Sequence, residues 1–67
     1  MKSERLIHFG ERIRELRKER NWSQETLAEG TGFHRTYIGM IERGERNLSL
    51  LNIQIFAKTF KITLQEL

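Results

Sequence analysis

The side chains with the most specific hydrogen-bonding chemistry lie in the stretch that begins at His34. Arg35 can donate two hydrogen bonds to O6 and N7 of a guanine, Thr36 offers a hydroxyl and a methyl group that can meet thymine, and Met40 offers apolar contact. Tyr37 lies at the border of the same predicted helical face. These residue types suit base-pair edges, but taken alone Arg35 is more simply read as a solvated residue at a helix start. The turn before the helix, described below, favours base recognition.

The sequence offers little for catalysis or metal binding. It contains no Cys and no Asp, and its two histidines, His8 and His34, lie far apart, so no cluster of metal ligands is expected. No serine has a histidine-and-acid companion, and no glycine-rich phosphate loop follows a strand. We therefore expect a protein that is not an enzyme and that uses no metal, cofactor or small-molecule ligand.

Charge and length set further limits. The formal net charge is only +3, but eight of the 12 basic residues are Arg, whose planar guanidinium suits phosphates and guanine edges. A chain of 67 residues makes one domain at most, here residues 1–67, and it has no Cys for a disulfide, so self-association is the remaining way to reinforce a small core. No run of apolar residues is long enough to span a membrane and no secretory signal is recognisable, so the cytoplasm is the expected location.

Apolar residues recur at helical spacing, and period-two alternation is missing, so the sequence predicts an all-α fold. Ser23 and Ser49 are predicted N-caps, and Thr63 with Glu66 has the spacing of a capping box. Five helices are expected, over residues 3–20, 23–30, 34–43 and 49–60 and in a last turn after Thr63.

The buried faces follow from the same spacing. In the first predicted helix Gly10 interrupts the apolar stripe as a soft spot, and between the second and third helices Gly32 can take a positive φ that ends the second. Trp22 is expected to close the joint between the first two helices. The residues predicted to point inward are Leu6, Phe9, Ile13, Leu16, Leu27, Ala28, Phe33, Ile38, Ile41, Leu50, Ile53, Phe56, Ala57 and Phe60.

Two short helices joined by a tight glycine-containing turn form a helix-turn-helix unit, whose second helix can lie in the major groove of DNA. In the helix that starts at His34, Ile38 and Ile41 must point to the core. The open face then carries Arg35, Thr36, Gly39 and Met40, with Gly39 allowing a close approach to DNA.

Contacts to the DNA backbone are predicted on both sides of this helix. Gln24 lies in the first turn of the second helix, beside the capping Ser23, where free N–H groups and the helix dipole favour a phosphate. Glu42 and Glu45 would repel phosphate unless they face away or are paired. A purely solvated surface therefore remains an alternative for the second set of backbone candidates, Arg43, Gly44, Arg46 and Asn47.

Residues 9–67 resemble the lambda-repressor/Cro type of helix-turn-helix domain, the XRE family. The resemblance is carried by "IRELR", "WSQETLA", "GTGF", "IERGERN" and "ITLQEL", each at the family's spacing. The segment "HRTYIGMIERGERNLSL" further resembles the controller proteins of bacterial restriction-modification systems, which are small dimeric transcription regulators.

The resemblance implies roles for individual residues. Gln24 matches a phosphate-binding glutamine, and Arg17 with Glu42 matches an internal salt bridge that gives Glu42 a structural role. His34 stands where the family more usually has Ser or Asp, so its cap is unassigned and a phosphate contact by the protonated ring is the other reading. Among the remaining matches, positions at base edges are Arg35 and Thr36, positions touching bases or backbone are Tyr37 and Met40, and backbone positions are Arg43 and Asn47.

Leu51 and Ile55 form an apolar i,i+4 pair opposite the buried stripe of the fourth helix, where the family often has polar residues. An exposed apolar patch on a small domain predicts a subunit interface, joined by Ile62 and Leu64. A two-fold homodimer would place two recognition helices about 34 Å apart and bind an inverted repeat. The alternative is that Leu51 and Ile55 close the edge of the core.

The sequence therefore predicts a homodimeric transcription regulator that binds double-stranded operator DNA, with a restriction-modification controller as the nearest resemblance. A protein-interaction module on the same fold is the alternative from another class. A phage-type repressor or an antitoxin is the alternative within the DNA-binding class. Activation and repression differ only in where the operator lies relative to a promoter, which the sequence of the regulator does not specify.

Overall fold

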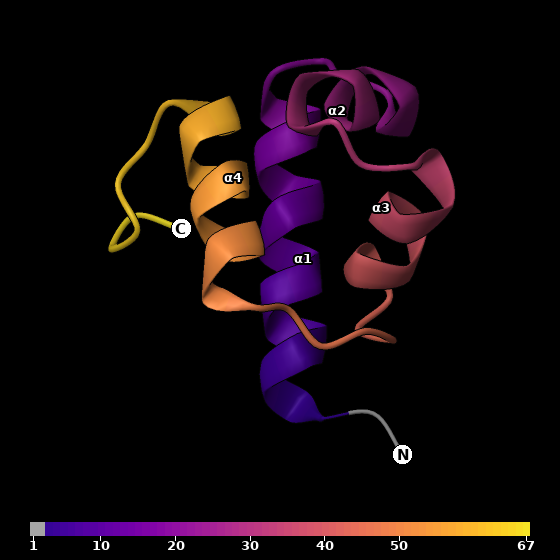
Figure 1. The fold of residues 1–67 in the computed structure, drawn as a ribbon, viewed down its shortest axis with the longest axis vertical. Coiled ribbons are helices and arrows are strands. Elements are labelled where there is room, and N and C mark those ends of the chain that lie inside the picture. Colours follow the sequence, from indigo (N-terminus) through magenta and orange to yellow (C-terminus); the bar gives the residue numbers. More distant parts are fainter. Residues whose placement is uncertain (1–2) are drawn as a thin grey trace.

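The longest helix, α1 (Glu4–Glu19), forms the centre of the structure, a computed structural model that describes residues 3–67 (Figure 1). The first two residues of the predicted unit lie outside that range. Ser3 caps α1 by accepting a hydrogen bond from the N–H of Arg5 (3.2 Å), and Glu4 lies at the positive end of the helix dipole. Ile13 and Leu16 of the predicted stripe are buried.

The second and third helices form the helix-turn-helix unit. Helix α2 (Gln24–Thr31) starts at Ser23, whose hydroxyl accepts from the N–H of Thr26 (3.0 Å), and it ends at Gly32, which has the positive φ (83°) that the sequence predicts. Helix α3 (Arg35–Glu42) follows after three residues, Gly32, Phe33 and His34. His34 occupies its N-cap position and makes no side-chain capping bond.

Helix α4 (Leu50–Phe60) lies on the other side of α1 from α3 in the view of Figure 1. Ser49 caps it by accepting from the N–H of Asn52 (3.1 Å), as predicted. Its later turns carry Phe56 and Phe60 into the core. Phe56 meets the ring of Phe9 from α1 (6.3 Å between centroids), while Phe60 stacks on Trp22 (5.6 Å). Aromatic contacts therefore join α4 to α1 and to the α1–α2 connection.

The expected all-α fold is confirmed, but the expected number of helices is wrong, because four helices are present in residues 3–67. The predicted capping box does form: the Thr63 N–H donates to the Glu66 carboxylate (2.9 Å), and the Glu66 N–H donates to the Thr63 hydroxyl (3.1 Å). Only one backbone bond of helical i,i+4 spacing follows it, from Leu67 to Thr63 (3.2 Å). One such bond closes a turn without propagating a helix.

Two predictions about the core are also wrong. Leu50 is 66% exposed, because α4 packs through its later turns and its first residue projects beyond the core. Gly10 is not a soft spot, since it is buried where α1 meets the end of α3. A Cβ at Gly10 would lie 2.7 Å from the carbonyl oxygen of Glu42, so the absence of a side chain permits this close contact.

Candidate nucleic-acid interface

The first turn of α3 presents two polar side chains to solvent. Arg35 and Thr36 are both exposed, and the Arg35 side chain retains 64% of its accessible surface. Its Nε lies 4.0 Å from a carboxylate oxygen of Glu25 on α2, whose side chain is also exposed. An exposed pair at this distance contributes little to stability, so the guanidinium can exchange Glu25 for another acceptor at small cost.

The middle of α3 differs from the prediction at one residue. Gly39 is buried instead of lying open, because the side chain of Arg43, one turn later, folds back over it. A Cβ at Gly39 would lie 3.1 Å from Nη1 of Arg43. Arg43 also pairs with Glu45, with 3.2 Å between Nε and the carboxylate. Met40, next to Gly39, is half-buried.

Tyr37 is held on several sides. Its hydroxyl oxygen accepts a hydrogen bond from Nδ2 of Asn52 on α4 (2.9 Å). Its ring meets Phe33 edge-on with 5.0 Å between centroids, and the guanidinium of Arg46 lies 5.6 Å from its centroid, within the range of a cation–π interaction. Tyr37 therefore joins α3 to α4 and to the loop after α3.

Glu42 is the acceptor of a hydrogen-bond network that connects three helices. Arg17 of α1 donates to it twice, from Nε to Oε2 (2.7 Å) and from Nη2 to Oε1 (3.0 Å), and Gln24 of α2 donates from Nε2 (3.2 Å). The third nitrogen of Arg17 donates to the carbonyl oxygen of Trp22 (2.9 Å). The Glu42 side chain is only 4% exposed, so its charge is compensated inside the protein.

The loop after α3 keeps its cations at the surface. Gly44, with φ of 72°, reverses the chain against Ile7 of α1. Arg43, Arg46 and Asn47 are exposed around it. This loop and the first turn of α3 together carry three exposed arginines, Arg35, Arg43 and Arg46. Exposed cations of this kind can bind the phosphates of a nucleic acid.

Apolar side chains are exposed on α4 and in the turn after it. Leu51 (65%) and Leu50 (66%) lie in the first turn of α4, and Leu64 is 47% exposed. Ile55 is half-buried, and Ile62 is half-buried against the core. We call Leu50, Leu51 and Ile55 of α4 the apolar face. Sequence reasoning missed Leu50 because helical spacing assigned it to the buried stripe.

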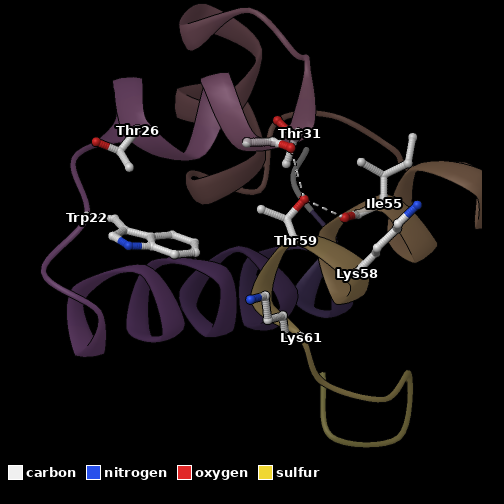
Figure 2. A pocket seen from close by; sticks show the side chains of 8 residues that line it. Trp22, Thr26, Thr31, Ile55, Lys58, Thr59 and Lys61 are labelled. Atoms are coloured by element: carbon white, nitrogen blue, oxygen red, sulfur yellow. Dashed lines mark hydrogen bonds between the residues drawn. The ribbon is translucent and has the colours of Figure 1, made fainter.

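Two of the hollows on the surface of residues 3–67 lie beside the helix-turn-helix unit. The larger, about 610 Å³, lies between α2 and α4 and is shown in Figure 2 with Trp22 and Ile55 at its walls and Lys58 and Lys61 at its rim. Inside it the Thr59 hydroxyl lies within hydrogen-bonding distance of the carbonyl oxygens of Ile55 (2.8 Å) and Gly30 (3.3 Å). The smaller, about 330 Å³, lies beside the start of α3 and is lined by Gly32, Phe33, His34, Tyr37 and Asn52.

Within residues 3–67 the structure contains no group of three or more His, Cys, Asp or Glu side chains that could hold a metal ion. Over the same residues, no helix combines the length and the apolar character that crossing a membrane requires.

Asn52 is a site residue that the sequence did not indicate, because nothing in its spacing shows that its amide meets Tyr37, 15 positions earlier.

Comparison with known proteins is consistent with this geometry. Residues 13–67 match the helix-turn-helix family HTH_3. The control protein C.SmaI of Serratia marcescens is 47% identical over 59 residues, which cover 88% of this chain and 70% of that protein. The control protein C.BamHI of Bacillus amyloliquefaciens is 45% identical over 60 residues, covering 88% and 74%.

Solved structures of controller proteins have the same fold as this chain. The restriction-modification controller protein C.AhdI of Aeromonas hydrophila superposes with a TM-score of 0.91 at 47% identity, over 96% of this chain and 97% of that one. A tetramer of the controller C.Esp1396I in complex with its natural 35 base-pair operator gives 0.86 at 31% identity, over 96% and 88%.

The chain belongs to the helix-turn-helix family HTH_3, a class of DNA-binding transcription regulators. Within it, the protein is of the restriction-modification controller type, as the resemblance of residues 34–50 predicts. This membership confirms the predicted regulatory function and the prediction that the protein is not an enzyme.

Proposed function

We propose that this protein binds an inverted-repeat operator as a homodimer, with α3 of each subunit in the major groove. The observation that carries the proposal is the exposure of Arg35 and Thr36 in the first turn of α3, while Ile38 and Ile41 on its other face are fully buried. The N-terminal residues of a recognition helix are those that reach base edges. Arg35 donates to a guanine and Thr36 contacts a neighbouring base.

The remaining contacts divide by the partner that each residue can reach. Tyr37 and Met40, both half-buried at the edge of the exposed face, add base contacts. Gln24 donates one amide hydrogen to Glu42. Its other amide hydrogen donates to a phosphate at the start of α2. The other residues that we assign to the DNA backbone are Ser23, His34, Arg43, Arg46 and Asn47. Gly39 is left out of this set because the Arg43 side chain covers it.

The apolar face supports the dimer. Leu50 and Leu51 together expose a larger apolar surface than single scattered residues normally do on so small a protein, and Ile55 borders them on the same helix. A two-fold interface there would also bury Leu64 and the exposed edge of Ile62. The resulting dimer matches the symmetry of an inverted repeat and acts in the cytoplasm, where operators are accessible.

The test begins with selection of bound sequences from random duplex DNA. We expect enrichment of an inverted repeat, which then serves as the specific probe. Arg35→Ala should weaken binding to this probe by roughly 1 to 3 kcal/mol and to random DNA much less, whereas Gln24→Ala should weaken both alike. Arg14→Ala, an exposed arginine on α1, is the matched control. Equal losses for Arg35→Ala on both DNAs would reject base readout, and no enrichment at all would favour a protein-interaction module.

A further inference from the structure

Asn52 belongs to α4, but its side chain reaches Tyr37 on α3. Its Nδ2 donates to the Tyr37 hydroxyl oxygen across 2.9 Å. Its own main-chain N–H is bonded to the capping hydroxyl of Ser49 (3.1 Å), which fixes the first turn of α4 from which the side chain extends. A rigid helix terminus therefore holds the end of a side chain on α3.

The direction of this hydrogen bond decides what Tyr37 can do. A phenol has one hydrogen to donate and an oxygen that accepts. Because the Asn52 amide donates, the oxygen is the acceptor and the phenolic hydrogen remains available for another group. Tyr37 and Asn52 both line the smaller hollow, beside His34 and the start of α3, and this hollow is open to solvent.

We propose that Asn52 is a positioning residue for DNA recognition, which makes Tyr37 a hydrogen-bond donor toward an acceptor atom of the DNA. The inference rests on the proposed function, because it requires α3 to meet DNA. The same bond holds the Tyr37 ring where Arg46 lies over it, 5.6 Å from the ring centroid, so Asn52 also sets the position of one backbone-contacting cation.

The decisive variant is Asn52→Asp. A carboxylate of the same shape accepts hydrogen bonds only, so the phenolic hydrogen turns toward it and Tyr37 stops being a donor for DNA. Folding is not at risk, because an acidic residue in the first turn of α4 favours the helix dipole and the capping bond from the residue 52 N–H is kept. We expect about a tenfold loss of affinity for the selected operator, matching Tyr37→Phe, with thermal stability equal to wild type or higher.

A double-mutant cycle separates this role from simple charge repulsion. In the Tyr37→Phe background, Asn52→Asp should cause no further loss, because the donor is already gone. Gln54→Glu makes the same change of charge at an exposed position of α4 and should have a small effect. A loss that persists in the Tyr37→Phe background, or wild-type affinity for Asn52→Asp, would overturn the proposal.

Comparing the operator with random DNA identifies the DNA atom that accepts the hydrogen bond from Tyr37. If it is a phosphate oxygen, Asn52→Asp weakens binding to operator and random DNA equally, and if it is a base edge, only operator binding suffers. Both results support a donor role for Tyr37. A failure of the proposed function is recognised separately, because wild-type protein would then enrich no operator and Arg35→Ala would change no preference.

Discussion

Glu42 illustrates how a single residue is assigned to structure instead of to DNA. An acidic side chain close to a DNA-binding surface would oppose phosphate if its charge were free. Here it is 4% exposed and accepts from Arg17 and Gln24, which come from two other helices. The charge is compensated within the protein, and the pair with Arg17 holds the end of α3 against α1.

Removing Arg17 should therefore be strongly destabilising. Arg17→Ala would leave the Glu42 carboxylate buried with only the Gln24 amide as a donor, and loss of one partner from a buried pair costs about 3 to 5 kcal/mol. Arg14→Ala, at an exposed position of the same helix, should change the free energy of unfolding by less than about 0.5 kcal/mol. Urea unfolding of both variants measures the difference, and similar midpoints would contradict a structural role for the pair.

At the scale of elements, glycines govern how the helices approach. At Gly10 the main chain of α1 lies against the carbonyl groups of Ile41 and Glu42 at the end of α3. At Gly39 the neighbour is the flexible side chain of Arg43. Both glycines lie within helices, where Ala is intrinsically better, but only the first is surrounded by main chain that cannot move.

Substitution by Ala should thus have opposite effects at the two positions. Gly10→Ala would force α1 and α3 apart and should destabilise the fold by about 1 to 3 kcal/mol despite its better helix propensity. Gly39→Ala should stabilise it by up to about 1 kcal/mol, since Arg43 can shift by a few tenths of an ångström. Thermal unfolding of the pair tests this, and a stable Gly10→Ala variant would show that the contact is not tight.

The turn after α4 is stabilised by hydrogen bonds between Thr63 and Glu66 and by the charge of Arg12. The pKa of Glu66 is lowered from its ordinary value of 4.5, first by the hydrogen bond from the Thr63 N–H, then by the Thr63 hydroxyl, and also by the positive charge of Arg12, while desolvation opposes these effects. Arg12 additionally donates to the carbonyl oxygen of Glu66 (2.7 Å). These contacts hold the turn that contains Leu64, and they depend on one carboxylate.

Acid should loosen this turn. Because the folded pKa of Glu66 is depressed, the stabilisation is complete above the unfolded value and is lost as the pH falls through the folded value, below 4.5. NMR amide shifts of Thr63 and Glu66 should therefore change below that pH in the wild type, while Glu66→Gln should lack the transition. An unchanged transition in Glu66→Gln would assign the pH effect to another carboxylate.

For the whole molecule, we propose that the apolar face sets the state of assembly. Leu50 and Leu51 are each about two-thirds exposed, and a water-exposed patch of this kind is most simply covered by a second copy related by two-fold symmetry. Dimerisation would place both α3 helices on one side of a DNA duplex. Operator occupancy would then rise steeply with protein concentration.

Charge on this face should prevent assembly. Leu51→Glu/Ile55→Glu should sediment as a monomer at concentrations where the wild type is a dimer, because two carboxylates cannot be desolvated against their symmetry mates. The operator affinity of the double variant should also fall, since each half-site would be bound independently. Arg14→Glu on α1 is the control for added negative charge, and an unchanged mass of the double variant at equal concentration would reject the interface.

Local sequence signals were sufficient for most of the secondary structure. Apolar spacing predicted α1 to α4 to within a few residues, and the caps Ser23 and Ser49 and the positive φ of Gly32 were recognisable from residue type. These features depend on residues within one or two helical turns. The motifs from Ile13 to Leu67 were sufficient for the family, because their spacing reflects one particular arrangement of helices.

Contacts between elements were decided only by the tertiary structure. The burial of Gly39 under Arg43, the close approach at Gly10, the exposure of Leu50 and the bond from Asn52 to Tyr37 have no signature in periodicity. Each depends on the distance and rotation between two chain segments and on where a side chain ends, quantities that residue spacing does not contain. The sequence by itself therefore determined the first four helices and the family, while packing decided that no fifth helix forms and which side chains of α3 remain exposed.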